Sequence, residues 1–332
     1  MVSLRQLEYL VAVADHGSFT RAAEQLHVTQ PALSHQMRIL ERLSGGPLVE
    51  RLPRSVRLTP AGRAMLPHAR AALADAYRAR CAARQVSGLD QGELRLAAVY
   101  SVGLGVLPPV LRRWRQRHHD VQISLSEHRH TEELVATMTE GGADLAVGPS
   151  PRRWSGPVWM LGDEEFVVVL PPDDPAGADG ARRVDLAELA DRTWVHYASG
   201  NGLAEVVDQA CGEAGFRPAA AVRTEQTAAA PVLASAGLGP ALVPANMVPP
   251  AFDGLVLRPD PPVRRSLTAY TRPDPDPLTE AFVEMLIETA CVLPETLRDR
   301  LGLDNGFGHL GSPGRPLEAV TPRDPSPPTA TR

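Results

Sequence analysis

Apolar residues recur at helical spacing through the first forty residues of the chain, and cap residues divide them into three short helices. The first helical face consists of Leu4, Leu7, Leu10, Val11 and Ala14. Gly17 ends this pattern, and Ser18 is a suitable N-cap for a second helix over residues 19–26. Thr29 is a further N-cap, so a third helix is predicted over residues 30–43.

A tight turn at Leu26–Val28 joins the second and third helices, and the small side chain of Ala23 lets the two helices cross closely. Pro31 lies in the first turn of the third helix, where proline is tolerated. Two short β-like runs follow at residues 48–51 and 56–59. This order of elements predicts a helix-turn-helix followed by a hairpin wing.

An Ala-rich helical pattern continues from residue 60 to about residue 85, with Pro67 inside it. A helix of this length with a stripe of small residues is expected to pair with a second copy of itself. The alternative is a helix that packs only on its own domain. A Gly-containing hinge is predicted over residues 87–92.

From residue 93 onward, strand-like and helix-like runs alternate, which predicts parallel sheets flanked by helices. The predicted strands are residues 94–99, 121–126, 144–147, 166–170, 193–197, 219–222, 241–243 and 266–271. The predicted helices are residues 104–117, 132–140, 203–214, 227–236 and 278–293. Two such α/β units joined by strand crossings would form two lobes around a cleft.

The predicted fold class is therefore α/β, with an N-terminal winged helix-turn-helix and a two-lobed, Rossmann-like domain. The expected divisions are a winged domain at 1–60, a linker helix at 61–86, a hinge at 87–92, a two-lobed domain at 93–300 and a Gly- and Pro-rich disordered tail at 301–332. Lobe I is expected to comprise residues 93–162 and 271–300, and lobe II residues 163–270.

Composition and charge refine this organisation. The chain of 332 residues has a net charge of −5, yet residues 1–90 carry twelve arginines against seven acids, and the remainder carries twenty-two against thirty-two. The first part is thus basic, which suits contact with DNA, and the second part is acidic. No stretch reaches the roughly 20 apolar residues of a membrane helix, and no secretory signal pattern opens the chain. We expect a cytoplasmic protein without membrane contact.

Neither the cysteines nor the histidines indicate a metal or cofactor. Cys81, Cys211 and Cys291 are widely spaced without a C-x-x-C pair, so buried free thiols are favoured over a redox role for Cys211 or Cys291. A group of four histidines could indicate a metal site, but simple surface exposure is favoured: His118, His119, His128 and His130. No catalytic motif such as G-x-S-x-G, H-E-x-x-H or a P-loop occurs, so no enzyme is predicted.

Four N-terminal motifs carry a family resemblance. They are Leu4–Leu10 (LRQLEYL), Gly17–Ala23 (GSFTRAA), Gln25–Ser34 (QLHVTQPALS) and Leu58–Gly62 (LTPAG). In register over about sixty residues, they resemble the DNA-binding domain of LysR-type transcriptional regulators, and a weaker likeness continues to about residue 295. The resemblance implies a winged DNA-binding domain, a dimerising linker helix and an effector domain similar to periplasmic solute-binding proteins. Val49 and Gly46 depart from the residues usual in the family, phenylalanine and valine.

The third helix is the expected DNA-reading element, because a recognition helix presents its N-terminal residues to base edges in the major groove. Gln30 can pair with adenine through two hydrogen bonds, and the Pro31 ring can touch a thymine methyl. The full expected set of DNA contacts is Arg21, Thr29, Gln30, Pro31, Ser34, His35, Arg38, Arg54 and Arg57. The alternative is a polar helix face that is only solvated.

The effector is expected beyond the carboxyl ends of the strands in the two-lobed domain, where ligands of open α/β sheets bind. This rule, together with the family resemblance, nominates Tyr100, Ser101, Gly148, Tyr197, Ser199, Gln226 and Thr227. Hydroxyls and amides at helix starts favour a small anion or polar organic acid. For Ser199 and Thr227, a purely structural N-cap is an equal alternative.

The predicted function is a LysR-type regulator whose effector modulates promoter binding. Expected partners are double-stranded DNA with a promoter palindrome, a small-molecule effector, a second or further copies in a homodimer or homotetramer, and RNA polymerase if the protein activates. The alternatives are a transport-type solute-binding protein, which the helix-turn-helix disfavours, and a global DNA-binding protein, which would not need a two-lobed domain.

Overall fold

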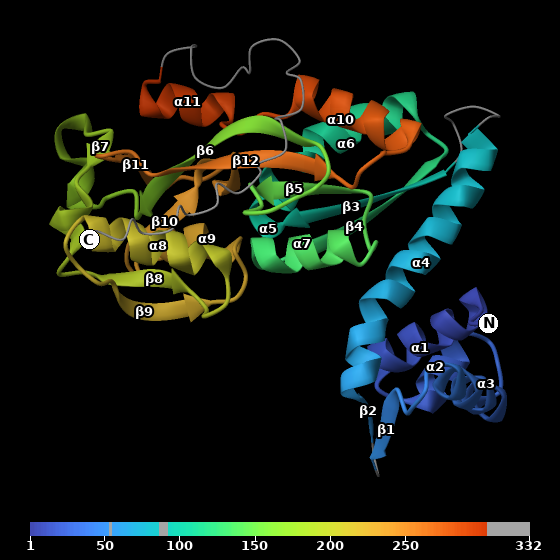
Figure 1. Ribbon diagram of the computed structural model, residues 1–332. Coiled ribbons are helices and arrows are strands. Elements are labelled where there is room, and N and C mark those ends of the chain that lie inside the picture. Colours follow the sequence, from blue (N-terminus) through green and yellow to red (C-terminus); the bar gives the residue numbers. More distant parts are fainter. Residues whose placement is uncertain (53–54, 86–91, 304–332) are drawn as a thin grey trace, which may run out of the picture. The chain divides into compact units, whose positions relative to one another are not determined.

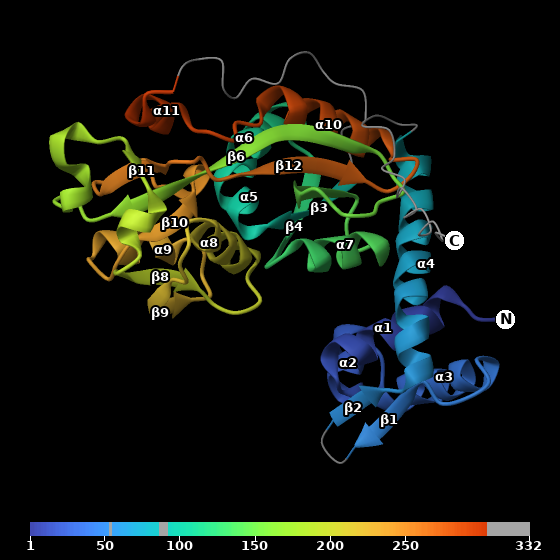
Figure 2. The same ribbon diagram turned by 60° about the vertical axis from the view of Figure 1, so that its left-hand side comes forward.

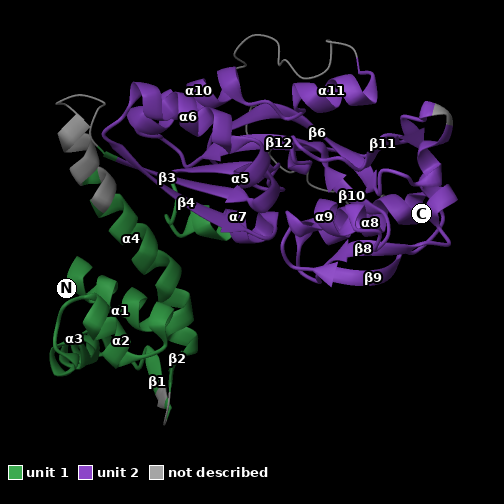
Figure 3. Cartoon of the chain, turned by 180° about the vertical axis from the view of Figure 1, so that it is seen from behind, with its two compact units in different colours: residues 1–92, 136–143 green, residues 93–135, 144–332 purple. Residues whose placement is uncertain are grey.

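The computed structural model describes residues 1–52, 55–85 and 92–303, and these form two compact units (Figure 1). One unit contains residues 1–92 and 136–143, and the other contains residues 93–135 and the chain from 144 onward (Figure 3). The predicted hinge lies almost entirely outside the described residues, as does most of the predicted tail. None of the helices in the described ranges combines the length and apolar character needed to cross a membrane.

The first unit contains the three predicted helices: α1 (Leu4–His16), α2 (Phe19–Gln25) and α3 (Gln30–Leu43). Ser3 caps α1 in a reciprocal capping box with Gln6. The apolar faces of the three helices meet in one core around Leu10, Leu33 and Leu40, each fully buried. The periodicity seen in the sequence is therefore the core-facing side of the helices.

The hairpin and the long helix predicted after the third helix are both present in the structure. The wing consists of β1 (Val49–Leu52) and β2 (Ser55–Leu58), which pair antiparallel. The linker helix is α4 (Pro60–Gln85), which contains Pro67, and α1 packs along it (Figure 2). Val49, which replaces the usual phenylalanine, is buried in the core of this unit.

The second unit is built on one mixed sheet with the strand order β4-β3-β5-β12-β6-β11-β7, and β10 also pairs with β6. The strands are β3 (Gly92–Val99), β4 (Val121–His128), β5 (Leu145–Pro149), β6 (Val158–Leu170), β7 (Arg183–Val184), β10 (Ala241–Pro244), β11 (Leu255–Pro259) and β12 (Arg264–Thr271). A separate parallel pair is formed by β8 (Thr193–Tyr197) and β9 (Ala219–Thr224).

The helices of this unit complete the two lobes. They are α5 (Tyr100–Gly105), α6 (Leu107–Arg117), α8 (Gly202–Glu213), α9 (Ala229–Ser235), α10 (Pro277–Thr289) and α11 (Glu295–Leu301), together with the first part of α7 (Thr131–Thr139), whose residues from 136 onward belong to the first unit. Short 3-10 turns occur at η1 (Pro175–Gly180), η2 (Leu186–Leu189) and η3 (Ala245–Met247). In lobe I, α6 packs against α10, with Trp114 and Phe282 edge to face.

The long strand β6 joins the lobes (Figures 1 and 2). Its first part pairs with β12, and its second part, Phe166–Leu170, pairs with β10 and β11. The sequence predicted only residues 166–170, because these are continuously apolar and the residues before them are not. The prediction of parallel sheets was wrong for β6 and β10, which pair antiparallel with each other, and the predicted return strand β12 is antiparallel to both β5 and β6.

Three other expectations need correction. The predicted helix at 104–117 is two helices, because a proline pair at the start of α6 can be accommodated only in a first helical turn. The short strands β7 and β11 were not predicted. Helix α11 was not predicted either. Its Leu297 and Leu301 belong to the core of lobe II, although residues 271–300 were expected in lobe I. The described residues continue to 303, past the expected start of the tail at 301.

Candidate functional site

The helix-turn-helix is built by local capping. Ser18 Oγ accepts from the Arg21 N–H at 3.4 Å, and Thr29 Oγ1 accepts from the Ala32 N–H at 3.4 Å. Between the helices, His27 adopts a left-handed conformation with φ of 52°, which allows the tight turn. The two helices therefore meet at a fixed angle, with Ala23 buried.

Most of the residues predicted to contact bases are exposed, at the N-cap of α3 and along the first nine residues of this helix. Five of them are exposed on the surface: Thr29, Gln30, Pro31, His35 and Arg38. Ser34 differs, because its side chain is buried with only 7% of the residue exposed. Helical spacing places position 34 on the edge between the polar face and the core, so sequence alone could not decide its side.

The predicted phosphate contacts lie outside α3. Arg57 is exposed on β2, opposite Glu50 of the wing. Arg21 is exposed, and its guanidinium donates to the His16 carbonyl at 2.6 Å, so it is held at the end of α1. Arg54, also predicted to contact phosphate, lies outside the described residues.

One basic residue of this surface was not predicted. Arg42 is exposed one turn beyond Arg38, and both line an open hollow of 670 Å³ with His35 and Gly45–Pro47. The i, i+4 spacing of Arg38 and Arg42 is the signal that could have identified it. The basic residues His35, Arg38 and Arg42 therefore gather on the middle and last part of α3, and Glu41 also lines this hollow.

Substitutions on this surface should distinguish residues that recognise bases from residues that bind phosphates. We expect Arg57→Ala to weaken binding to all duplexes alike and to reduce the slope of the salt dependence by about one ion, because Arg57 is an exposed cation on the wing and is predicted to contact phosphate. We expect Gln30→Ala to change base preference instead, costing about 1–3 kcal/mol at one position of the site. Affinities for specific and random duplexes at several salt concentrations measure both effects. Equal losses on the two duplexes for Gln30→Ala would contradict its reading role.

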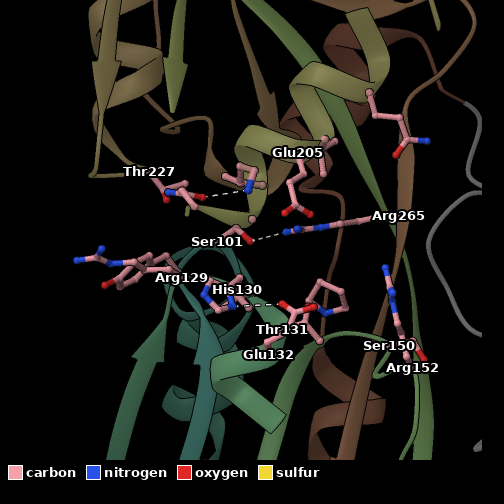
Figure 4. A pocket seen from close by; sticks show the side chains of 18 residues that line it. Ser101, Arg129, His130, Thr131, Glu132, Ser150, Arg152, Glu205, Thr227 and Arg265 are labelled. Carbon is pink, nitrogen blue, oxygen red and sulfur yellow. Dashed lines mark hydrogen bonds and ion pairs between the residues drawn. The ribbon is translucent and has the colours of Figure 1, made fainter. Parts of the chain in front are cut away.

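The second candidate site is a cleft of 230 Å³ within the two-lobed unit (Figure 4). Lobe I contributes the start of α5, the loop from β4 to α7 and the residues after β5, whereas lobe II contributes the start of α8 and Thr227. Its charged or titratable lining residues are Tyr100, Arg129, His130, Glu132, Arg152, Glu205 and Arg265. His130 bonds with Glu132, so it is already partnered on the lobe I side.

Two polar groups in the cleft lack partners among the described residues. The Thr227 hydroxyl and the Asn201 amide nitrogen are buried without a hydrogen bond, and their residues are 3% and 5% exposed. The Asn201 Oδ1 atom is used, because it accepts from the Leu203 N–H at the start of α8. Unpartnered buried polar groups cost free energy, so a ligand that bonds them would stabilise the domain.

The cleft contains three of the seven predicted effector residues: Tyr100, Ser101 and Thr227. The other four lie elsewhere. Ser199 and Gln226 are exposed outside the cleft lining. Gly148 is buried in β5, where an added Cβ would lie 2.8 Å from Leu134.

Tyr197 must be corrected, because it is a core residue. Its side chain is fully buried, and its hydroxyl donates to the Leu242 carbonyl at 3.3 Å. Burial raises the pKa of this phenol well above its ordinary value. Residues 194–197 of β8 are all buried and Tyr197 joins the lobe II core, which the rule about carboxyl ends of strands cannot show.

The sequence-based prediction missed the cleft arginines. Arg129 follows the carboxyl end of β4, so the same rule applied to this strand would have nominated it. Arg265 lies near the start of β12, a return strand to which the rule does not apply. Arg152 follows β5 by three residues and is exposed.

Family models match both parts of the chain. Residues 4–63 match the bacterial regulatory helix-turn-helix protein, lysR family, and residues 87–291 match the LysR substrate binding domain. A probable hydrogen peroxide-inducible genes activator of Mycobacterium avium is 37% identical over 247 residues, which cover 73% of this chain and 78% of that protein. The RuBisCO operon transcriptional regulator of Allochromatium vinosum is 36% identical over 215 residues, 64% of this chain and 70% of the relative.

Solved structures agree with these matches. Full-length CbnR complexed with its target DNA has a TM-score of 0.63 and 28% identity, covering 86% of this chain and 99% of that one. A winged DNA-binding domain joined to a two-lobed ligand domain defines a bacterial transcriptional regulator. The chain belongs to the LysR family, so it is a DNA-binding regulator with an effector-binding domain.

Proposed function

We propose that this regulator binds an imperfect promoter palindrome as a homodimer or homotetramer, and that a small polar organic acid in the interlobe cleft changes this binding. The observation that carries the effector proposal is the pair of unpartnered buried donors, Thr227 Oγ1 and Asn201 Nδ2, whose residues line the same cleft as Arg265. Hydroxyl, amide and guanidinium donors converging on one cleft match the oxygens of a carboxylate.

The DNA side of the proposal rests on α3. Its exposed N-terminal residues, Thr29, Gln30, Pro31 and His35, present short donors, acceptors and a methylene ring to base edges in the major groove. Arg38 and Arg42 extend this face toward phosphates, and Arg57 provides a wing contact. One such domain covers few base pairs, so two half-sites and at least two copies are required.

The linker helix α4 is the proposed dimerisation element. Its residues 71–73 and Ala76 are only partly covered within one chain, which leaves three alanines and one leucine for contact with a second copy. In the cytoplasm, such a dimer would change its affinity or its bend on DNA when the effector favours one arrangement of the lobes. If this arrangement activates transcription, RNA polymerase is the further partner.

The effector proposal is tested by binding and by its effect on DNA. A panel of small carboxylates is screened for a rise in the melting temperature, and each hit is then added to a promoter-fragment footprint. We expect a stabilising acid that alters the footprint, and loss of its binding in Thr227→Val, which keeps the side-chain shape but removes the hydroxyl. Unchanged acid binding in Thr227→Val would refute the cleft as the effector site.

Hydrogen peroxide, named for one relative, is not the proposed signal. Cys211 is fully buried in α8, and burial raises the pKa of its thiol to about 12. The reactive form of cysteine is the thiolate, which is scarce at neutral pH when the pKa is this high.

We therefore expect Cys211 to react negligibly with peroxide or with Ellman's reagent at neutral pH in the folded protein. Its reactivity should rise only on unfolding or as the pH approaches the raised pKa. Thiol titration of the native and denatured protein, with Cys211→Ser to assign the signal, measures this. Rapid oxidation of native Cys211 would contradict the assignment of a non-oxidative effector.

A further inference from the structure

Two adjacent carboxylates on β6 are buried where the strand passes from one lobe to the other. Glu164 is 0% exposed and Glu165 is 5% exposed. Because successive side chains of a strand point to opposite faces, the two carboxylates serve different partners. Glu165 binds Arg258 and Arg264, at 2.5 and 2.7 Å, whereas Glu164 binds Asn246 and Arg265.

Glu164 belongs to a chain of contacts that ends in the effector cleft. Asn246 Nδ2 of η3 donates to Glu164 Oε1 at 2.9 Å, and Arg265 Nε donates to Glu164 Oε2 at 2.5 Å. A second nitrogen of Arg265 donates to Ser101 Oγ at 3.0 Å (Figure 4). These hydrogen bonds therefore connect α5 of lobe I to η3 of lobe II through the Arg265 guanidinium and the Glu164 carboxylate.

Arg265 differs from the other two arginines of the cleft. Its side chain is 16% exposed, and its guanidinium lies over the Phe166 ring at 5.5 Å, whereas Arg129 and Arg152 are exposed residues. A guanidinium has five N–H donors, and the bonds to Glu164 and Ser101 use two of them. Arg265 is thus a fixed, partly desolvated cation that still has donors for a ligand.

We propose that Arg265 anchors the acid group of the effector and that Glu164 is an internal counter-ion that competes with the effector for this guanidinium. The inference rests on the proposed function, because it concerns the same cleft. Without an effector, Glu164 neutralises Arg265; an entering carboxylate shares the guanidinium with Glu164 and Ser101 through its remaining donors. Occupancy of the cleft is thereby transmitted to both lobes, and the site discriminates between an acid and its neutral amide.

The test compares two isosteric substitutions of neighbouring residues. Glu164→Gln keeps an oxygen for Arg265 but removes the competing charge, whereas Glu165→Gln removes an equally buried charge whose partners, Arg258 and Arg264, do not line the cleft. The probes are succinate with succinamide, benzoate with benzamide, and pyruvate with pyruvamide. Calorimetric titration measures the affinity of each probe for the full-length chain and its variants.

We expect at least one carboxylate to bind the unmodified protein better than its amide. In Glu164→Gln, its affinity should rise about tenfold, since a negative charge near the bound anion is gone. In Glu165→Gln it should stay within about twofold, although both variants lose thermal stability. In Arg265→Gln, the preference for acid over amide should disappear. If Glu164 had only a structural role, the Glu164→Gln substitution would not increase the affinity for the carboxylate.

Several results would overturn the inference. They are unchanged or weaker carboxylate binding in Glu164→Gln, an equal gain in Glu165→Gln, and binding of amides but not acids. The absence of binding by any probe would also refute the anion anchor. These failures can be distinguished from failure of the proposed effector site. If a probe loses its binding in Thr227→Val but keeps its affinity in Glu164→Gln, the cleft is still the effector site and only the counter-ion role of Glu164 is rejected.

Discussion

Replacing Gly62 with alanine is expected to disrupt the junction between the wing and α4 and to abolish DNA binding. A Cβ at position 62 would lie 2.0 Å from the Leu48 carbonyl oxygen, a backbone atom that cannot move aside cheaply. That oxygen also accepts the Thr59 N–H, and Thr59 Oγ1 caps the start of α4 at Gly62. Overpacking typically costs about 1–3 kcal/mol, and we expect a backbone clash to reach at least the upper end.

Gly46→Ala is the matched control for this substitution. Gly46 lies close by in the sequence, and its added Cβ would meet nothing within 4 Å. Thermal unfolding by circular dichroism should therefore be nearly unchanged in this variant, which makes it the control for stability. Comparable losses in both variants, or a stable Gly62→Ala protein that binds DNA normally, would contradict the packing described at the wing.

Truncation of Trp114 should give the second large effect, this time in the two-lobed domain. Trp114 is fully buried in α6, stacks with His118 at 4.0 Å between centroids and meets Phe282 of α10 at 5.1 Å. Trp114→Ala should lower the free energy of unfolding by about 3–5 kcal/mol, because a large cavity remains between the two helices.

Trp114→Phe should cost less than half as much. The Trp114 indole nitrogen is buried without a hydrogen-bond partner among the described residues, so phenylalanine loses volume but no hydrogen bond. Urea unfolding of both variants, followed by circular dichroism, gives the comparison. Equal destabilisation by Ala and Phe would show that the indole nitrogen makes a bond that the contacts described for Trp114 do not include.

The parts predictable from sequence are those governed by local rules. Caps such as Ser18 and Thr29, helical periodicity and the turn at Leu26–Val28 placed α1, α2 and α3 to within one or two residues. The same was true of β8, whose predicted bounds match the structure. Each of these signals depends on residues close together in the chain.

The unpredicted parts depend on contacts between distant segments. The orientation of β12, the lobe that α11 joins and the burial of Ser34 follow from tertiary packing, which local patterns do not specify. The same is true of the cleft: Arg265 meets Ser101 across 164 positions of sequence. Charged residues in a sequence are normally expected to be exposed, so the sequence did not indicate that Glu164 and Glu165 are buried.

The central claim is that the exposed N-terminal end of α3 enters the major groove of duplex DNA. Footprinting of the full-length protein on the DNA upstream of its own gene tests this directly. The account predicts two protected half-sites spaced by about 10 base pairs or a multiple of this, with protection lost in a Gln30→Ala, His35→Ala double variant that remains folded. Absence of protection at low ionic strength, or a footprint unchanged in the double variant, would contradict it.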